Sequence, residues 1–99
     1  MPSTKDYLDY VLELLNELDG IAYKKMMGEY LLYKDGVLFG GVYDNRFLIK
    51  NVKTLKGEGL SEEIPYEGAK PMLLVDSEDS EYIAELINKV IKSISASSR

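Results

Sequence analysis

The sequence predicts an α+β domain in which an antiparallel sheet carries helices packed on one face. Three observations predict this class. Apolar residues recur at three- and four-residue spacing near both ends of the chain, which is typical of amphipathic helices. The middle of the chain is rich in aromatic residues and is divided by short turn sequences, which is typical of antiparallel strands. The length of 99 residues suits one domain with one modest core.

The first predicted helix spans residues 4–18. Its apolar stripe consists of Tyr7, Leu8, Val11, Leu14, Leu15 and Leu18. Ser3 or Thr4 is expected to cap its start, because a side-chain oxygen there can accept from an N–H group of the first turn. Ser3 with Asp6 resembles a loose capping box. Gly20 is expected to end the helix, because glycine readily adopts the left-handed backbone of a helix terminus.

Residues 29–34, 37–43 and 46–50 are predicted to form a three-stranded antiparallel meander. Asp35-Gly36 is a strong hairpin signal, because both central positions of a type I′ turn need positive φ. Asp44-Asn45 provides the second turn. Gly40 and Gly41 are expected to mark a bulge or a close packing contact. Residues 23–27 either extend the first strand or lead into it.

The chain between the meander and the last helix has weaker patterns. Residues 51–60 are predicted to contain a short helix, broken by Gly57 and Gly59. A second hairpin is expected from strands at 63–66 and 71–75, joined by a turn at Glu67-Gly68. Pro65 is expected to keep the shorter strand near an edge, because proline cannot donate to a sheet hydrogen bond.

The last helix has the clearest signal in the chain. Its apolar stripe consists of Ile83, Leu86, Ile87, Val90, Ile91 and Ile94, and Asp76 or Ser77 is expected to cap it. The predicted order is therefore α-β-β-β-α-β-β-α, with five strands in the sheet. We expect a single domain over residues 1–99, with its core at about 5–93 and a frayed tail at 95–99.

Composition argues against catalysis and against export. The chain has no cysteine and no histidine. Ser-His and Cys-His nucleophile systems are therefore excluded within it, as are disulfides and thiolate metal sites. We expect no enzymatic activity, no catalytic residue, no bound metal and no cofactor. The sequence also lacks an apolar run of signal-peptide or membrane-span length, so we expect a cytoplasmic protein that does not associate with membranes.

Charge is unevenly distributed along the chain. The net charge is −5, which disfavours direct binding to nucleic acid. Residues 21–60 nevertheless carry seven basic and four acidic residues. The basic residues considered for binding an anionic partner are Lys24, Lys25, Arg46, Lys50, Lys53 and Lys56. The alternative is ordinary solvated charge on exposed strand positions.

Eight tyrosines are many for a chain of this length. Tyr30, Tyr33 and Tyr43 fall on neighbouring predicted strands, where some of them are expected to share a face. Exposed together, they would favour a protein interface, because tyrosine is enriched at binding hot spots. The alternative is that they pack at the edge of the core. Met26-Met27 is interpreted as core filler rather than as an adaptable contact surface.

The ordered motifs of residues 25–50 resemble the N-terminal domain of the TfoX/Sxy family of bacterial competence regulators. These motifs are Lys25-Met26-Met27-Gly28-Glu29-Tyr30, Leu32-Tyr33-Lys34-Asp35-Gly36-Val37-Leu38-Phe39-Gly40, and then Asp44, Leu48 and Lys50. Gly68-Ala69-Lys70-Pro71 and the final helix also fit, so the resemblance covers about residues 5–93. It implies an α-β3-α-β2-α fold similar to that of type III secretion chaperones. It also implies regulation of transcription through a protein such as the cyclic-AMP receptor protein, and no catalytic residue.

The sequence therefore predicts a non-enzymatic protein-binding or regulatory domain, with a transcription factor or RNA polymerase as the expected kind of partner. The partner-binding candidates are Tyr30, Tyr33, Tyr43, Lys24, Lys25, Arg46, Lys50 and Lys53. The alternative function is a small-ligand or nucleic-acid binding module that uses the basic middle segment. A homodimer through a sheet edge or the last helix is a further alternative.

Overall fold

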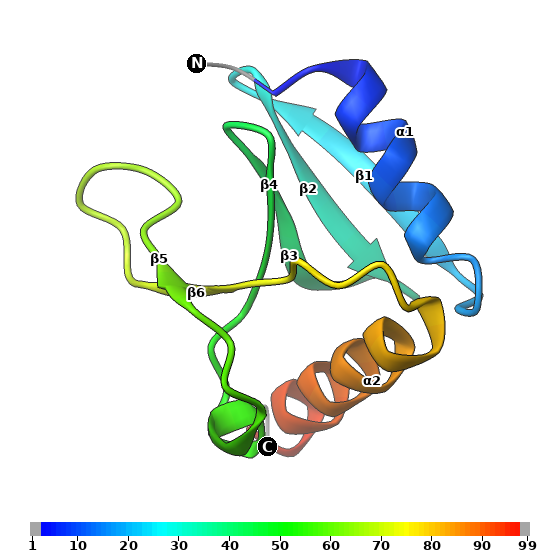
Figure 1. Cartoon of the computed structure of the whole chain (residues 1–99), viewed down its shortest axis with the longest axis vertical. Helices are drawn as coiled ribbons and strands as arrows, with labels where there is room; N and C mark the ends of the chain where they lie inside the picture. The colour runs from blue at the N-terminus through cyan, green and yellow to red at the C-terminus, as the bar shows by residue number, and fades with distance from the viewer. Residues whose placement is uncertain (1–2, 98–99) are drawn as a thin grey trace.

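The computed structural model describes residues 3–97, with the side chains of residues 3–95, and contains an antiparallel sheet with a helix at each end of the chain (Figure 1). The elements in chain order are α1 (Lys5–Leu14), β1 (Ile21–Met26), β2 (Glu29–Lys34), β3 (Val37–Tyr43), β4 (Arg46–Ile49), the 3₁₀ helix η1 (Lys53–Glu58), β5 (Glu62–Glu63), β6 (Met72–Leu74) and α2 (Ser80–Ser97). The six strands have the spatial order β1-β2-β3-β4-β6-β5. The predicted α+β class and the antiparallel sheet are confirmed.

Both helices cover the same face of the sheet, as predicted (Figure 1). Leu8 and Val11 of α1 and Ile83 and Ile87 of α2 are fully buried in one apolar cluster. From the sheet, this cluster includes Tyr30, Leu32, Phe39, Val42, Phe47, Ile49 and Leu73. Side chains alternate between the two faces of a strand, so the residues between these positions lie on the opposite face, which we call the outer face.

The expected five strands are wrong, because residues 21–26 form a sixth strand. β1 pairs with β2 over its whole length, from Ile21 opposite Lys34 to Met26 opposite Glu29. The turn between them is Met27-Gly28, with φ of 52° and 85°. These values match a type I′ hairpin turn, in which methionine is an unusual residue. The two turns predicted at Asp35-Gly36 and Asp44-Asn45 also have positive φ at both central residues.

The glycine pair in β3 lies at a bulge and at two close backbone contacts. Leu32 is opposite Gly40 whereas Tyr33 is opposite Leu38, so Phe39 is an extra residue on β3. A Cβ atom on Gly40 would meet the carbonyl oxygen of Leu48 on the neighbouring strand. Both expectations for these glycines, a bulge and close packing, are confirmed.

Several predicted boundaries and caps differ from the structure. α1 ends at Leu14 rather than at residue 18, because the following backbone tightens into i→i+3 bonds such as Leu18 N–H to the Leu15 carbonyl. Thr4 caps α1 by accepting from the Tyr7 N–H group, as expected. The short helix at 51–60 is a 3₁₀ helix, and β5 is limited to Glu62–Glu63, at the sheet edge.

The expected cap of the last helix is also wrong. Asp79 caps α2 by accepting from the N–H groups of Glu81 and Tyr82 at 3.0 and 3.3 Å, and Ser77 accepts from the Asp79 N–H group instead. Asp79 is the N-cap residue because it directly precedes the first helical residue. A carboxylate there also faces the positive end of the helix dipole. α2 continues to Ser97, into the tail expected to fray, and residues 98–99 lie outside the described residues.

Ser3 binds Glu29 rather than forming a capping box with Asp6. Its hydroxyl donates to Glu29 Oε1 at 2.7 Å, and its backbone N–H donates to the same oxygen at 3.1 Å. Glu29 also accepts from the Asp44 N–H group at 3.1 Å, while the Ser3 hydroxyl oxygen accepts from the Asn45 N–H group. One carboxylate therefore joins the start of the described chain to two hairpin ends.

A second carboxylate joins η1 to α2. Glu58 accepts from the Tyr82 hydroxyl at 2.8 Å and from Lys89 Nζ at 3.0 Å. Hydrogen bonds from Tyr82 and Lys89 hold the pKa of Glu58 below its ordinary value of 4.5. The folded state therefore favours the ionised carboxylate, and the stabilisation is present above the unfolded-state pKa and is lost as the pH falls through the folded-state pKa.

We expect Glu58→Gln to reduce stability at pH 7 and to make unfolding less sensitive to acid. The glutamine keeps a hydrogen bond but cannot pair with the Lys89 ammonium. Urea unfolding at a series of pH values between 7 and 3 checks this, with Glu17→Gln as a control on an exposed side chain. The stability difference between wild type and Glu58→Gln should shrink as the pH falls. A difference that stays constant across this range would contradict the prediction.

Candidate functional site

The basic residues of the middle segment do not form one surface. Lys24 and Lys25 lie on β1 at one edge of the sheet, whereas Lys50 follows β4 and Lys53 lies on η1. β2 and β3 separate the two groups. Because neighbouring strands are about 4.8 Å apart, the groups are more than 10 Å apart across the sheet. A single anionic partner bound by all of these residues would have to span that distance.

The three candidate tyrosines lie on opposite faces of the sheet. Tyr30 belongs to the core cluster and is only 6% exposed, so it packs under the helices. Tyr33 and Tyr43 lie on the outer face, where Tyr43 is buried and Tyr33 is half-buried. The Tyr43 ring lies 6.3 Å from the ring of Tyr66, between centroids. The tyrosines exposed at the surface are Tyr10, Tyr23 and Tyr66, which the sequence patterns did not single out.

Arg46 anchors the loop of residues 64–71, which joins β5 to β6. Its guanidinium donates to the Glu63 carboxylate at 2.9 Å and to the carbonyl oxygens of Ile64 and Pro65 at 3.1 and 3.4 Å. Its Nε donates to the Tyr43 carbonyl at 3.2 Å. The side chain therefore links the start of β4 to Glu63 of β5 and to the first two residues of the loop, which holds the loop close to β4. Arg46 thus makes its hydrogen bonds within the fold.

The β1–β2 hairpin presents an exposed strand edge with an apolar tip. All residues of β1 after Ile21 are exposed, and the only strand that pairs with β1 among residues 3–97 is β2. Tyr23 and Met26 are 44% and 45% exposed, and Met27 is 96% exposed. The interpretation of Met26-Met27 as core filler is therefore wrong, because the hairpin turn carries both side chains away from the core.

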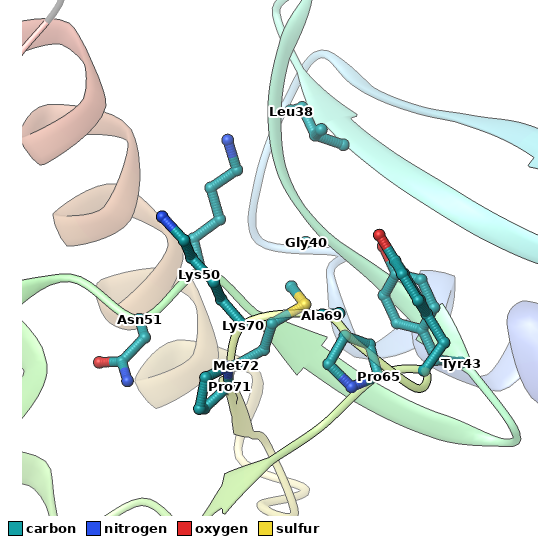
Figure 2. Close-up of a pocket in the computed structure, with 11 residues that line it drawn as sticks. Leu38, Gly40, Tyr43, Lys50, Asn51, Pro65, Ala69, Lys70, Pro71 and Met72 are labelled. Carbon is teal, nitrogen blue, oxygen red and sulfur yellow. The ribbon is translucent and has the colours of Figure 1, made fainter.

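A pocket of about 440 Å³ lies on the outer face, beneath the loop of residues 64–71 (Figure 2). Figure 2 shows Lys50 and Lys70 on one side of it and Tyr43 and Pro65 on the other, with Met72 between them. Lys50 was a candidate from the sequence. Lys70 and Tyr66 were not, because the folding of the loop over the sheet cannot be read from a local pattern.

The remaining site types have little support within the part of the chain that the structure describes. No group of three or more His, Cys, Asp or Glu side chains there is arranged to hold a metal ion. None of the helices within residues 3–97 is both long enough and apolar enough to cross a membrane. The acidic residues at 76–81 instead supply the Asp79 cap of α2.

Comparison with known proteins adds no assignment to this geometry. The chain matches no model of a known protein family, and no curated protein has a significant sequence match to it. The resemblance to the N-terminal domain of the TfoX/Sxy family therefore stays a prediction based on the motifs of residues 25–50.

Proposed function

We propose that this chain is a non-enzymatic, protein-binding regulatory domain whose docking surface is the free edge and the apolar tip of the β1–β2 hairpin. The observation that carries the proposal is the exposure of β1, a six-residue edge strand that is followed in the turn by the almost fully exposed Met27. An exposed edge offers unpaired N–H and C=O groups to which an extended segment of another protein can add as a strand.

The two edges of the sheet differ in how they are protected. At the opposite edge, β5 is only two residues long, consists of Glu62 and Glu63, and is followed by Pro65. Short, charged edge strands next to proline resist pairing with other chains. β1 is longer and lacks proline. The contrast supports β1 as the edge that accepts a partner.

Met27 supports the same conclusion, because a methionine at this turn position lowers the stability of the isolated domain. It has a φ of 52°, in a region that favours glycine, asparagine and aspartate over methionine. Its side chain is also exposed to water. With Met26 it gives this end of the edge strand an adaptable apolar contact, and Tyr23 adds exposed apolar surface on the opposite face of the strand. Use of this contact in binding explains why a residue that is unfavourable for stability occupies the turn.

Charge indicates the chemistry of the partner. Lys24 and Lys25 lie on β1, and neither makes an ion pair with the acidic side chains that the structure describes. They would attract an acidic extended segment. They also disfavour a homodimer through this edge, because antiparallel pairing of two β1 strands would bring the lysines of both copies close together. The motif resemblance favours a transcription regulator as the protein that carries the acidic segment.

Charge reversal on β1 tests the proposal. Tagged wild type and Lys24→Glu/Lys25→Glu are used to capture proteins from a bacterial lysate treated with nuclease. We expect the double variant to capture at least about tenfold less partner than wild type, because it places two negative charges against an acidic strand. Lys53→Glu/Lys56→Glu makes the same charge change on η1 and should retain the partner. Met27→Asn should fold at least as stably as wild type and capture less partner.

The captured protein is then bound to the domain in pure form and examined by hydrogen exchange. Strand addition should slow exchange of β1 amides in the complex, because they become hydrogen-bonded. A partner that binds the Lys24→Glu/Lys25→Glu variant as well as wild type, or that leaves the exchange of β1 amides unchanged, would overturn the proposal.

A further inference from the structure

The outer-face pocket has one apolar side and one cationic side. Tyr43, Pro65 and Met72 provide apolar surface, and the Lys50 and Lys70 side chains provide two positive charges on the side away from Tyr43 (Figure 2). Its volume of about 440 Å³ is within the range of pockets that bind small molecules. The size and the separation of polarity both suit a ligand that has a ring at one end and an anion at the other.

The two lysines have no acidic partner in the described structure. The ion pairs among the described side chains involve Lys5, Lys34, Arg46 and Lys89, not Lys50 or Lys70. Among the residues that the structure describes, no aspartate or glutamate lines the pocket. Glu62 accepts from the Nδ2 of Asn51, a pocket residue, without lining the pocket itself. The positive charge inside the pocket is therefore not neutralised by a side chain that lines it.

The walls of the pocket are held in place by contacts within the fold. Tyr43 is buried on β3, and its ring packs near that of Tyr66. Burial raises the pKa of the Tyr43 hydroxyl above its ordinary value of 10.0, with smaller contributions from Tyr66, Glu29 and Tyr33, so it stays neutral. Arg46 fixes the loop that carries Pro65 and Lys70. A site whose walls are already ordered loses little conformational entropy on binding.

We propose that this pocket binds a small molecule consisting of a planar aromatic ring and a carboxylate or phosphate group. The ring lies against Tyr43, Pro65 and Met72, and the anion lies between the ammonium groups of Lys50 and Lys70. Charge-assisted hydrogen bonds from two ammonium groups recognise either anion. The pocket is separate from β1, so an experiment on ligand binding tests this proposal independently of the docking surface proposed above.

Nuclear magnetic resonance titration of the ¹⁵N-labelled protein tests this with indole-3-acetate as the carboxylate probe and indoxyl phosphate as the phosphate probe. Indole-3-acetamide is the matched neutral probe, and acetate is the anion without a ring. We expect saturable shifts at the amides of Lys50, Ala69 and Lys70 with at least one of the two anionic aromatic probes, and weaker or absent shifts with the other two. The probe that binds more tightly identifies the preferred anion.

Lysine variants test the role of the two charges. Lys50→Met and Lys70→Met should each weaken binding of the tighter probe by about fivefold or more, since each removes one charge-assisted contact. Lys53→Met removes one charge outside the pocket, so this variant should bind the same probe with the affinity of wild type. Absence of saturable pocket shifts with both anionic probes would overturn the proposal. So would equal binding of the neutral amide, or an equal loss of affinity in Lys53→Met.

Discussion

Replacing Gly40 with alanine is expected to destabilise the fold by about 3 kcal/mol, the upper part of the usual range for overpacking. A Cβ atom at this position would overlap the carbonyl oxygen of Leu48 and would lie 2.9 Å from the Cα atom of Ile49. Both atoms belong to the backbone of β4, so no side chain can rotate out of the way. β3 and β4 would have to separate where Gly40 lies opposite Ile49.

Chemical denaturation of Gly40→Ala and wild type measures this effect. Gly57→Ala is the matched control, because a Cβ at Gly57 would meet nothing within 4 Å and its φ is outside the left-handed region. We expect Gly57→Ala to change stability by less than about 1 kcal/mol, and to stabilise if it changes anything, since alanine restricts the unfolded chain. A Gly40→Ala protein as stable as Gly57→Ala would show that β3 and β4 do not approach as closely as described.

Replacing Arg46 with alanine is expected to destabilise the protein by about 2 kcal/mol, because it removes charge-assisted hydrogen bonds and leaves carbonyl groups without their donor. Arg46 is half-buried and holds Glu63, Ile64 and Pro65. The loop of residues 64–71 should loosen more than the core. The amide of Ala69, which donates to the Tyr66 carbonyl within this loop, should then exchange faster with solvent.

Urea unfolding and amide hydrogen exchange measure the two parts of this prediction. Glu63→Gln is the control, because it weakens one ion pair on a side chain that is 36% exposed and keeps the carbonyl contacts of Arg46. Its cost should be below about 1 kcal/mol, as for other accessible ion pairs. If Arg46 instead served only to contact a partner, Arg46→Ala would keep both its stability and the protection of Ala69, and the prediction would be wrong.

These two residues illustrate how far local patterns reach. Gly40 stood out in the sequence because glycine is unfavourable in a strand, and the structure explains it by the approach of a neighbouring backbone. Arg46 stood out only as a positive charge. Apart from the nearby Tyr43 carbonyl, its hydrogen-bond partners are 17 to 19 residues away in the chain, on a strand and a loop that no local pattern brings near it.

The site could be predicted only in part for the same reason. Lys50, a candidate from the sequence, lines the pocket, whereas Lys70 and Tyr66 reach that pocket from a loop folded back over the sheet. Tyr30 and Tyr33 looked equivalent in the sequence. Both lie on β2, three residues apart, so their side chains are on opposite faces of the sheet, and the packing of the helices decides that Tyr30 is the one beneath them.

The sequence by itself determined the two helices, the β2–β3–β4 meander and its two turns. These features depend on residues within a few positions of one another, as in the stripe from Ile83 to Ile94 and the turn at Asp35-Gly36. The tertiary structure alone decided that residues 21–26 add an edge strand, that Met27 is exposed at its tip, and that the loop of residues 64–71 closes a cationic pocket. Those outcomes depend on strand pairing and packing between distant segments, whose free energy is set by the whole fold rather than by local preference.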